Sequence, residues 1–154
     1  MGSRQASRRR VLRQGGMLAA LAACGLLTTR RAWALVDANA FDLKSFDEAL
    51  KALGSAPAES NAVVLTAPDI AENGAVVPVA VTSNLPKTQE IYLLVEKNPF
   101  PMTAAFTIPE GTEPFVSTRV KMGQSSLIHA VVKADGKFYS TRKEVKVTLG
   151  GCGG

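Results

Sequence analysis

The sequence predicts an all-β fold, an immunoglobulin-like antiparallel β-sandwich of about seven strands. A short helix is expected before the sandwich and a flexible glycine-rich arm after it. From Val63 onward, short apolar runs and runs of alternating apolar and polar residues follow one another, which is typical of strands. Turn-forming sequences separate the runs about every eight to twelve residues, as in β-sandwiches. The Cys–Trp–Cys core of antibody domains is absent, so the prediction depends on the number and spacing of strands.

Residues 1–34 have the features of a signal peptide. Ser7–Arg13 carries twin arginines, an apolar stretch runs from Gly15 to about Leu27, and Ala32-Trp33-Ala34 fits the small-x-small rule for signal peptidase. This order predicts export by the twin-arginine (Tat) pathway, cleavage after Ala34 and a periplasmic protein that is not held in the membrane. An uncleaved anchor is disfavoured because the apolar stretch is shorter than the ~20 residues that span a bilayer.

Lipidation is the alternative that the same segment leaves open. Leu21-Ala22-Ala23-Cys24 resembles a lipobox, in which Cys24 would carry the lipid and become the first residue of the mature protein. The apolar stretch continues past Cys24, and Ala32-Trp33-Ala34 follows it at a suitable distance. These two features favour cleavage after Ala34.

The charge of the chain is concentrated in its first 34 residues. The chain has 18 Lys and Arg against 13 Asp and Glu, but residues 1–34 hold seven of the arginines and no acid. The mature part therefore has 11 basic and 13 acidic residues, a net charge of −2. A chain without a basic excess offers no surface for nucleic acid.

Residues 35–60 are predicted to form a helix and a linker. Leu43, Phe46 and Leu50 share one face of a helix over Asp42–Leu53, with Asp42 as N-cap and Gly54 as terminator. A Ser/Ala/Pro-rich linker, Gly54–Ser60, follows.

Residues 61–149 are predicted to form the sandwich. Asn73-Gly74 predicts a hairpin or tight turn, Asn98–Pro101 a turn, and Asp135-Gly136 a hairpin loop. Pro78 has no amide hydrogen for a sheet ladder, so its strand should lie at an edge or a bulge there. The expected strands are Val63–Leu65, Ala75–Val81, Glu90–Glu96, Met102–Ile108, Phe115–Lys121, Leu127–Lys133 and Phe138–Leu149.

Residues 150–154 read Gly150-Gly151-Cys152-Gly153-Gly154. Glycine has the widest backbone freedom of any residue, so the pattern predicts a thiol on a flexible tether. Cleavage after Ala34 removes Cys24 and leaves Cys152 as the sole cysteine. A single cysteine in an exported protein either pairs between chains, as in a Cys152-linked homodimer, or remains a reactive thiol.

The neighbours of Cys152 in the sequence include nothing that would make it a catalyst. An activated cysteine needs a base, a cation or a helix N-terminus nearby, whereas Cys152 has glycines on both sides. His129, the only histidine, lies in an apolar run and is expected to pack or hydrogen-bond. Arg119 is expected to form a salt bridge rather than an anion site, and Met102 and Met122 to fill space. No metal motif is visible and no cofactor is predicted.

Several motifs together carry a resemblance to a known family. Gly150–Gly154 resembles the terminal signature of the SoxY family, the sulfur-carrier subunits of the periplasmic thiosulfate-oxidising (Sox) system. The twin-arginine segment is also similar. Further matching stretches follow in order: Pro68–Gly74, Val77–Val79, Asn98-Pro99, Ser117–Val120 and Asp135–Lys137.

The resemblance implies a non-catalytic carrier. It implies a heterodimer with SoxZ, in which Cys152 holds the substrate covalently and Gly150, Gly151, Gly153 and Gly154 form the swinging arm. The SoxAX cytochromes would join thiosulfate to Cys152, SoxB would hydrolyse off sulfate, and a sulfane dehydrogenase, SoxCD, would act where it is present.

Two other functions remain open from the residues. One is a structural or adhesive sandwich domain that uses Cys152 for an intermolecular disulfide. The other is a carrier that forms a thiocarboxylate on Gly154, although such chemistry needs ATP-dependent adenylation and fits poorly with an export signal.

Overall fold

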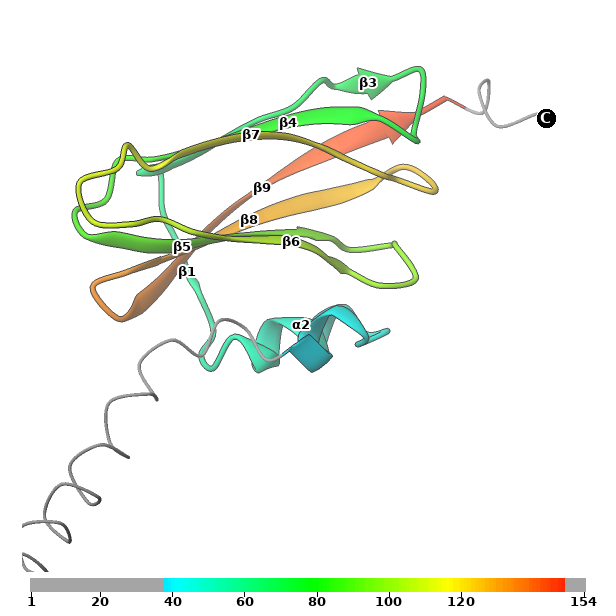
Figure 1. The fold of residues 1–154 in the computed structure, drawn as a ribbon. Coiled ribbons are helices and arrows are strands. Elements are labelled where there is room, and N and C mark those ends of the chain that lie inside the picture. The colour runs from blue at the N-terminus through cyan, green and yellow to red at the C-terminus, as the bar shows by residue number, and fades with distance from the viewer. Residues whose placement is uncertain (1–37, 149–154) are drawn as a thin grey trace, which may run out of the picture. The chain divides into compact units, whose positions relative to one another are not determined.

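Two β-sheets pack face to face in the computed structural model of this chain, which describes residues 38–148 (Figure 1). The sheets hold nine strands in that range, two of which have only two residues. The strands are β1 (Ala58–Glu59), β2 (Val63–Thr66), β3 (Ile70–Ala71), β4 (Val77–Ser83), β5 (Thr88–Val95), β6 (Met102–Thr107), β7 (Phe115–Val120), β8 (Ser126–Ala134) and β9 (Lys137–Val147).

The larger sheet has the order β1-β9-β8-β5-β6, and β3 also pairs with β9. The smaller sheet has the order β2-β4-β7. The predicted all-β sandwich is confirmed, and the seven longer strands correspond to the seven predicted runs. Two pairings differ from a purely antiparallel sandwich, because β1 and β3 both run parallel to β9.

The main core lies between the two sheets. On β5, Ile91, Leu93 and Val95 point into it, and Ile128, Ala130 and Val132 do so on β8. The smaller sheet contributes Val63, Val77, Val79, Val81 and Val120. Met122 is also buried here, which confirms its predicted space-filling role.

The other face of the larger sheet is covered by two short helices, η1 (Ala38–Phe41) and α2 (Phe46–Ala52) (Figure 1). Ala49 of α2 packs there with Tyr92, Leu94, Val131 and Met102 in a second buried cluster. Strands β5 and β8 are therefore buried on both faces, which explains why their sequences are almost continuously apolar. No helix within residues 38–148 is long and apolar enough to cross a membrane.

The helix begins later than predicted. The amide of Asp42 donates to the Asn39 carbonyl (3.1 Å) and so closes the turn of η1, which takes Asp42 out of the capping position. Ser45 is the N-cap instead, without a side-chain hydrogen bond. Gly54 does end the helix: its φ is positive, at 104°, and its amide donates a hydrogen bond to the Lys51 carbonyl.

Three local predictions can be compared with the described strands. Asn73-Gly74 forms a tight turn, but its flanking strands do not pair with each other, since β3 joins β9 and β4 joins β2 and β7. Pro78 of β4 pairs only with Arg119 of β7, because the pairing of β2 with β4 ends at Ala80 and does not extend to Pro78. The local edge predicted at Pro78 is confirmed. The expected linker contains β1, which adds to the sheet beside Tyr139 and Ser140.

Candidate functional site

The predicted site residues Cys152, Gly150, Gly151, Gly153 and Gly154 lie outside the described residues. Their roles remain predictions. The structure does describe the point where the arm joins the sandwich, at Val147 and Thr148. We call this point the arm root.

The arm root is fixed on both sides. The amide of Thr148 donates to the Ala71 carbonyl (3.1 Å), and the amide of Lys146 donates to the Asp69 carbonyl (2.9 Å). On the other side, the Ser125 hydroxyl accepts from the Val147 amide (2.9 Å). Because β9 is held by hydrogen bonds up to Thr148, the sandwich holds the start of the arm at a defined position.

Three loops surround the arm root at the same end of the sandwich (Figure 1). The turn after β3 contacts the β7–β8 loop, because the amide of Met122 donates to the Gly74 carbonyl (2.7 Å). The β5–β6 loop is bonded to the β7–β8 loop through Asn98, whose side-chain amide nitrogen donates a hydrogen bond to the Lys121 carbonyl (2.7 Å). Asn98 also accepts from the Gly123 amide (3.3 Å). These hydrogen bonds to backbone groups connect the turn after β3, the β5–β6 loop and the β7–β8 loop to one another.

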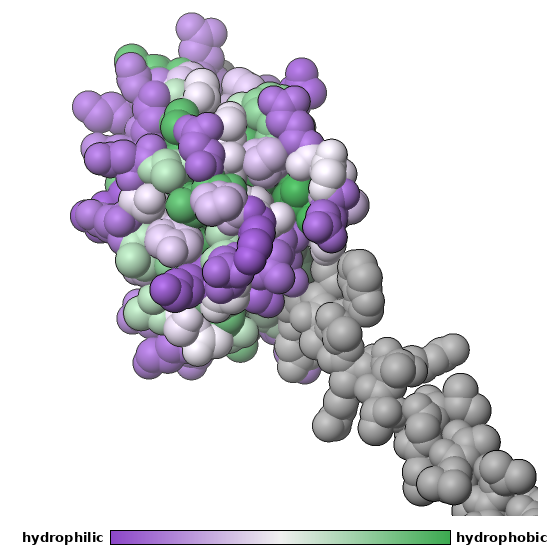
Figure 2. Space-filling view, turned by 90° about the vertical axis from the view of Figure 1, so that its left-hand side faces the viewer, coloured by the Kyte–Doolittle hydropathy of each residue, from purple (hydrophilic) through white to green (hydrophobic). Residues whose placement is uncertain are grey.

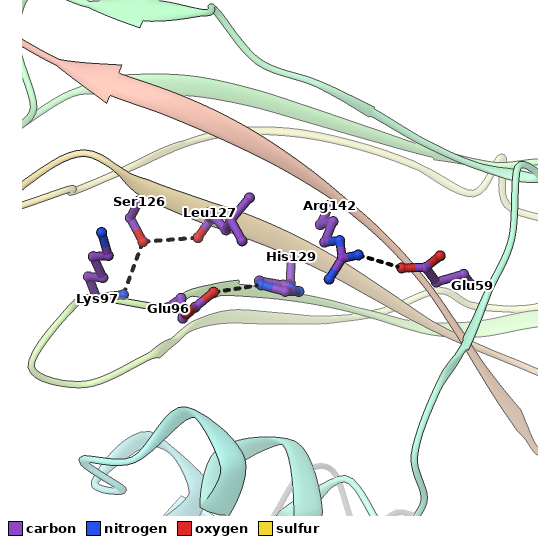
Figure 3. A network of polar contacts seen from close by, with 7 residues as sticks. All are labelled: Glu59, Glu96, Lys97, Ser126, Leu127, His129 and Arg142. Carbon is purple, nitrogen blue, oxygen red and sulfur yellow. Dashed lines mark hydrogen bonds and ion pairs between the residues drawn. The ribbon is translucent and has the colours of Figure 1, made fainter.

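His129 lies on the face of the larger sheet that α2 covers. The centroid of its ring is 4.5 Å from the centroid of the Phe46 ring. Its Nε2 is 3.3 Å from the Glu96 carboxylate (Figure 3). Burial lowers the pKa of His129, while the hydrogen bond and charge of Glu96 act to raise it and Arg142 acts to lower it. A neutral ring donates Nε2–H to the carboxylate, which can only accept. His129 has the packing and hydrogen-bonding role that its apolar run predicts.

Arg142 and Glu59 lie beside this pair and tie β1 to β9. Arg142 forms an ion pair with Glu59 at 3.2 Å, and both side chains are exposed (Figure 3). An exposed ion pair contributes about 0–1 kcal/mol, so the backbone pairing of β1 with β9 carries more of the attachment.

A second polar cluster is not predicted by the sequence. Tyr92 donates to the Glu90 carboxylate, which also pairs with Lys133 at 3.2 Å. Burial and the neighbouring Glu90 raise the pKa of Tyr92 above its usual value. Phe138 lies near both the Tyr92 ring and the Lys133 ammonium. The alternation in β5 places Glu90 and Tyr92 on one face, but the sequence does not reveal that α2 covers this face.

Two further predictions concern anions and metals. Arg119 is exposed on β7 and forms no ion pair with another residue of the 38–148 range, so the expected salt bridge is wrong for the described part. Within the same range, no group of three or more His, Cys, Asp or Glu residues is arranged to hold a metal ion.

Comparison with known proteins places this fold and its terminal segment in one family. The family model described as "Sulfur oxidation protein SoxY" matches residues 49–152, a range that ends at Cys152. The structure of the sulfur carrier protein SoxY from Chlorobium limicola f thiosulfatophilum is 42% identical with a TM-score of 0.61, over 67% of this chain and 96% of that chain. No curated protein sequence matches the chain.

Superoxide reductases share the fold at lower identity. A variant of the superoxide reductase (neelaredoxin) from Ignicoccus hospitalis is 25% identical with a TM-score of 0.50, over 69% of this chain and all of that chain. A putative superoxide reductase from Thermotoga maritima is 17% identical with a TM-score of 0.53, over 60% of this chain and 94% of that one. This likeness concerns the sandwich alone. By the family match and the similarity to the Chlorobium protein, the chain belongs to the SoxY family.

Proposed function

We propose that this chain carries sulfur intermediates of thiosulfate oxidation as covalent adducts of the Cys152 thiol. The observation that carries the proposal is the family match over residues 49–152, supported by the 42% identity to a sulfur carrier protein. The firmly held arm root supports it as well, because a carrier needs a fixed body and a tether that can reach other proteins.

The chemistry can be written in balanced steps. Cys152–SH and thiosulfate form a Cys–S–S–SO₃⁻ adduct with loss of one proton and two electrons, which pass to the SoxAX cytochromes. Water then attacks the terminal sulfur, releases sulfate and leaves a Cys–S–SH persulfide, a reaction assigned to SoxB. Where SoxCD is present, it would oxidise the remaining sulfane sulfur: Cys–S–SH and three water molecules give Cys–S–SO₃⁻ with loss of seven protons and six electrons, which pass to SoxCD. The carrier itself supplies the thiol and its position, and no catalytic group.

The same proposal includes the partner and the compartment. The chain pairs with SoxZ as a heterodimer, and the twin-arginine signal exports it to the periplasm. N-terminal sequencing of the mature protein tests the export route. A start at Leu35 supports cleavage after Ala34, whereas a lipidated Cys24 at the N-terminus contradicts it.

Mass spectrometry of the native exported protein tests the carrier function. Mass increments of sulfane sulfur, sulfonate or thiosulfonate on Cys152 are expected. A disulfide between two protein chains as the sole modification would favour the structural role, and a modified Gly154 carboxylate would favour the thiocarboxylate carrier. Either result would overturn the proposal.

The variant Cys152→Ser tests the same function kinetically. Thiosulfate-dependent electron transfer in the reconstituted Sox system should be abolished, because serine forms no disulfide-type adduct. Copurification with SoxZ and the thermal unfolding temperature should not change, since the described core ends at Val147. Activity retained by this variant would contradict the proposal.

A further inference from the structure

The last part of β9 is held differently from the rest of the strand. The antiparallel pairing of β9 with β8 covers nine positions and ends where Val145 meets Ser126. Beyond that point, Lys146 and Val147 pair with β3, which has two residues. We call residues 146–148 the clasped segment, and we call β3 the clasp.

Three backbone amides attach the clasped segment to the sandwich. Two of them donate to the carbonyls of Asp69 and Ala71, at the clasp. The third, that of Val147, donates to the Ser125 hydroxyl (2.9 Å). A single side chain therefore takes the place that a whole strand, β8, has along the preceding part of β9.

Side-chain burial adds little to this attachment. Lys146 and Thr148 are exposed, and Val147 is half-buried against the main core. Val145, in contrast, is fully buried. Segments with few buried apolar contacts open at a free energy well below that of global unfolding. The clasped segment can therefore separate from the sandwich while the rest of the fold stays intact.

The other end of β9 is bound along its whole length. There the strand follows β8 through the Asp135-Gly136 turn, and its first residue, Lys137, pairs with Ala134. An ion pair of Asp135 with Lys87 (3.3 Å) lies at the same hairpin. Figure 2 shows this end of the sandwich, where hydrophilic residues cover most of the surface and hydrophobic ones are scattered among them. Local separation of β9 is thus favoured at the arm root.

The clasp has anchors of its own outside the clasped segment. Lys143, in the part of β9 that pairs with β8, donates to the Ala67 carbonyl and forms an ion pair with Asp69 at 3.0 Å. On the other side of β3, the Met122 amide donates to the Gly74 carbonyl (2.7 Å). Because these bonds do not involve residues 146–148, the clasp stays in place as a site to which the segment can return.

Separation from the clasp would change the reach of the arm. With the segment bound, Cys152 is four positions beyond Thr148, so its Cα atom lies at most about 13–14 Å from that of Thr148. With the segment released, Cys152 is seven positions beyond Val145, and the limit becomes about 23–25 Å from Val145. The three released residues therefore add about 10 Å of tether.

We propose that the clasped segment is a reserve of tether for Cys152. It is bound to β3 in the free carrier and separates when the thiol must reach a reactive centre deeper than the bound arm spans. Ser125 and the clasp are positioning elements in this scheme, because they set the length of the arm through the backbone of β9. This inference rests on the proposed function and adds a second working length to the tether.

Amide hydrogen exchange of the mature carrier in its SoxZ heterodimer tests the opening directly. The protection factors of the Lys146 and Thr148 amides should be similar to each other and about 100-fold lower than that of Ala130 in β8, as for local opening. Protection equal to that of Ala130 would mean that the segment leaves only when the whole protein unfolds. Complete lack of protection would mean that it is never bound. Either result would overturn the proposal.

A shortened arm tests whether the reserve is used. Deletion of Leu149 and Gly150 removes about 7 Å of reach and keeps Gly151 directly before Cys152. In the reconstituted Sox system, turnover should fall without being abolished, because each cycle of the shortened carrier needs release of the clasped segment. Full turnover of the shortened carrier would contradict the proposal.

Weakening the clasp should then restore the shortened carrier. Thr148→Pro removes the amide that donates to Ala71. It should raise turnover of the shortened carrier by about 2- to 12-fold, the factor that one backbone hydrogen bond contributes to an opening equilibrium. Ser125→Ala removes a different bond of the same segment and should act in the same direction. Thr148→Ala keeps the amide and is the matched control, which should restore nothing.

The outcomes separate this inference from the function on which it rests. If the full-length carrier is turned over but neither Thr148→Pro nor Ser125→Ala improves the shortened one, the reserve is wrong. Equal improvement by Thr148→Ala would also overturn it, since the amide bond would then not be the cause. If the full-length carrier holds no sulfur adduct and supports no turnover, the proposed function itself fails, and hydrogen exchange still decides whether the segment opens.

Discussion

Gly74 approaches Met122 so closely that no side chain fits between them. A Cβ atom on Gly74 would lie 2.4 Å from the Met122 carbonyl oxygen and 2.8 Å from Cγ1 of Val147. The same two residues share a backbone hydrogen bond of 2.7 Å. This contact joins the turn after β3 to the β7–β8 loop directly beside the arm root.

Gly74→Ala should therefore destabilise the protein. The added methyl group meets backbone that cannot rotate away, and overpacking of this kind costs about 1–3 kcal/mol. Chemical denaturation should show a loss of about 2–3 kcal/mol in the free energy of unfolding. Gly123→Ala is the matched control, because a Cβ on Gly123 has no atom within 4 Å. Equal stability of the two variants would contradict the argument.

His129 should make stability depend on pH in a range where few other groups titrate. Burial holds its pKa in the folded protein below the usual value of 6.5, so the unfolded chain binds the proton more tightly. Stability is then fully present above about pH 6.5 and falls as the pH drops toward the folded pKa. The free energy of unfolding should decrease from about pH 7.5 to about pH 5.5, with a slope of at most ~1.4 kcal/mol per pH unit.

His129→Gln is the control for this slope. Glutamine keeps a hydrogen-bond donor for Glu96 but does not titrate, and the chain has no second histidine. The variant should lose most of the slope over this interval. An unchanged slope would show that other groups cause the pH dependence.

Valine at Gly151 and Gly153 should slow the delivery of Cys152 without changing its chemistry. β-Branched side chains restrict the backbone and widen the chain, so the thiol reaches a narrow active site less readily. Turnover in the reconstituted Sox system should fall on the order of tenfold, since misplacement by about 1 Å already costs up to ~100-fold in enzymes. Alkylation of Cys152 by N-ethylmaleimide should proceed at the wild-type rate. Wild-type turnover in the Gly151→Val/Gly153→Val variant would contradict this role of the glycines.

The strands that the sequence predicts well are those with strong local patterns. The runs around Ile91, Ile128 and Val145 have enough apolar or alternating residues to mark a strand, and Asp135-Gly136 adopts the two positive φ angles, 48° and 74°, that such a hairpin needs. The two-residue strands β1 and β3 are not predictable in this way. Two residues have no periodicity, and their pairing with β9 depends on contacts between distant parts of the chain.

The candidate site also has one part that the sequence predicts and one part that it does not. Cys152 stands out from its neighbours in sequence, because glycine pairs on both sides of a thiol form a local signal. The loops around the arm root give no such signal, since Gly74, Asn98 and Met122 are separated by 24 positions each and their loops meet only in the folded chain. The late start of α2 is not visible in the sequence pattern for a related reason. The amide of Asp42 bonds to the Asn39 carbonyl and closes the turn of η1, so Asp42 does not cap α2.

The position of β9 has a consequence for the order in which this protein can be made. The last strand of the described chain lies inside the larger sheet, paired with β8 over nine positions and with both β1 and β3. Synthesis delivers it after the other eight described strands, so β8 lacks its neighbour and Val145 is missing from the core until β9 emerges. A nascent chain interrupted before Val147 leaves this sheet unfinished. The two parallel partners of β9, β1 and β3, likewise have no strand in this sheet to pair with until β9 is in place.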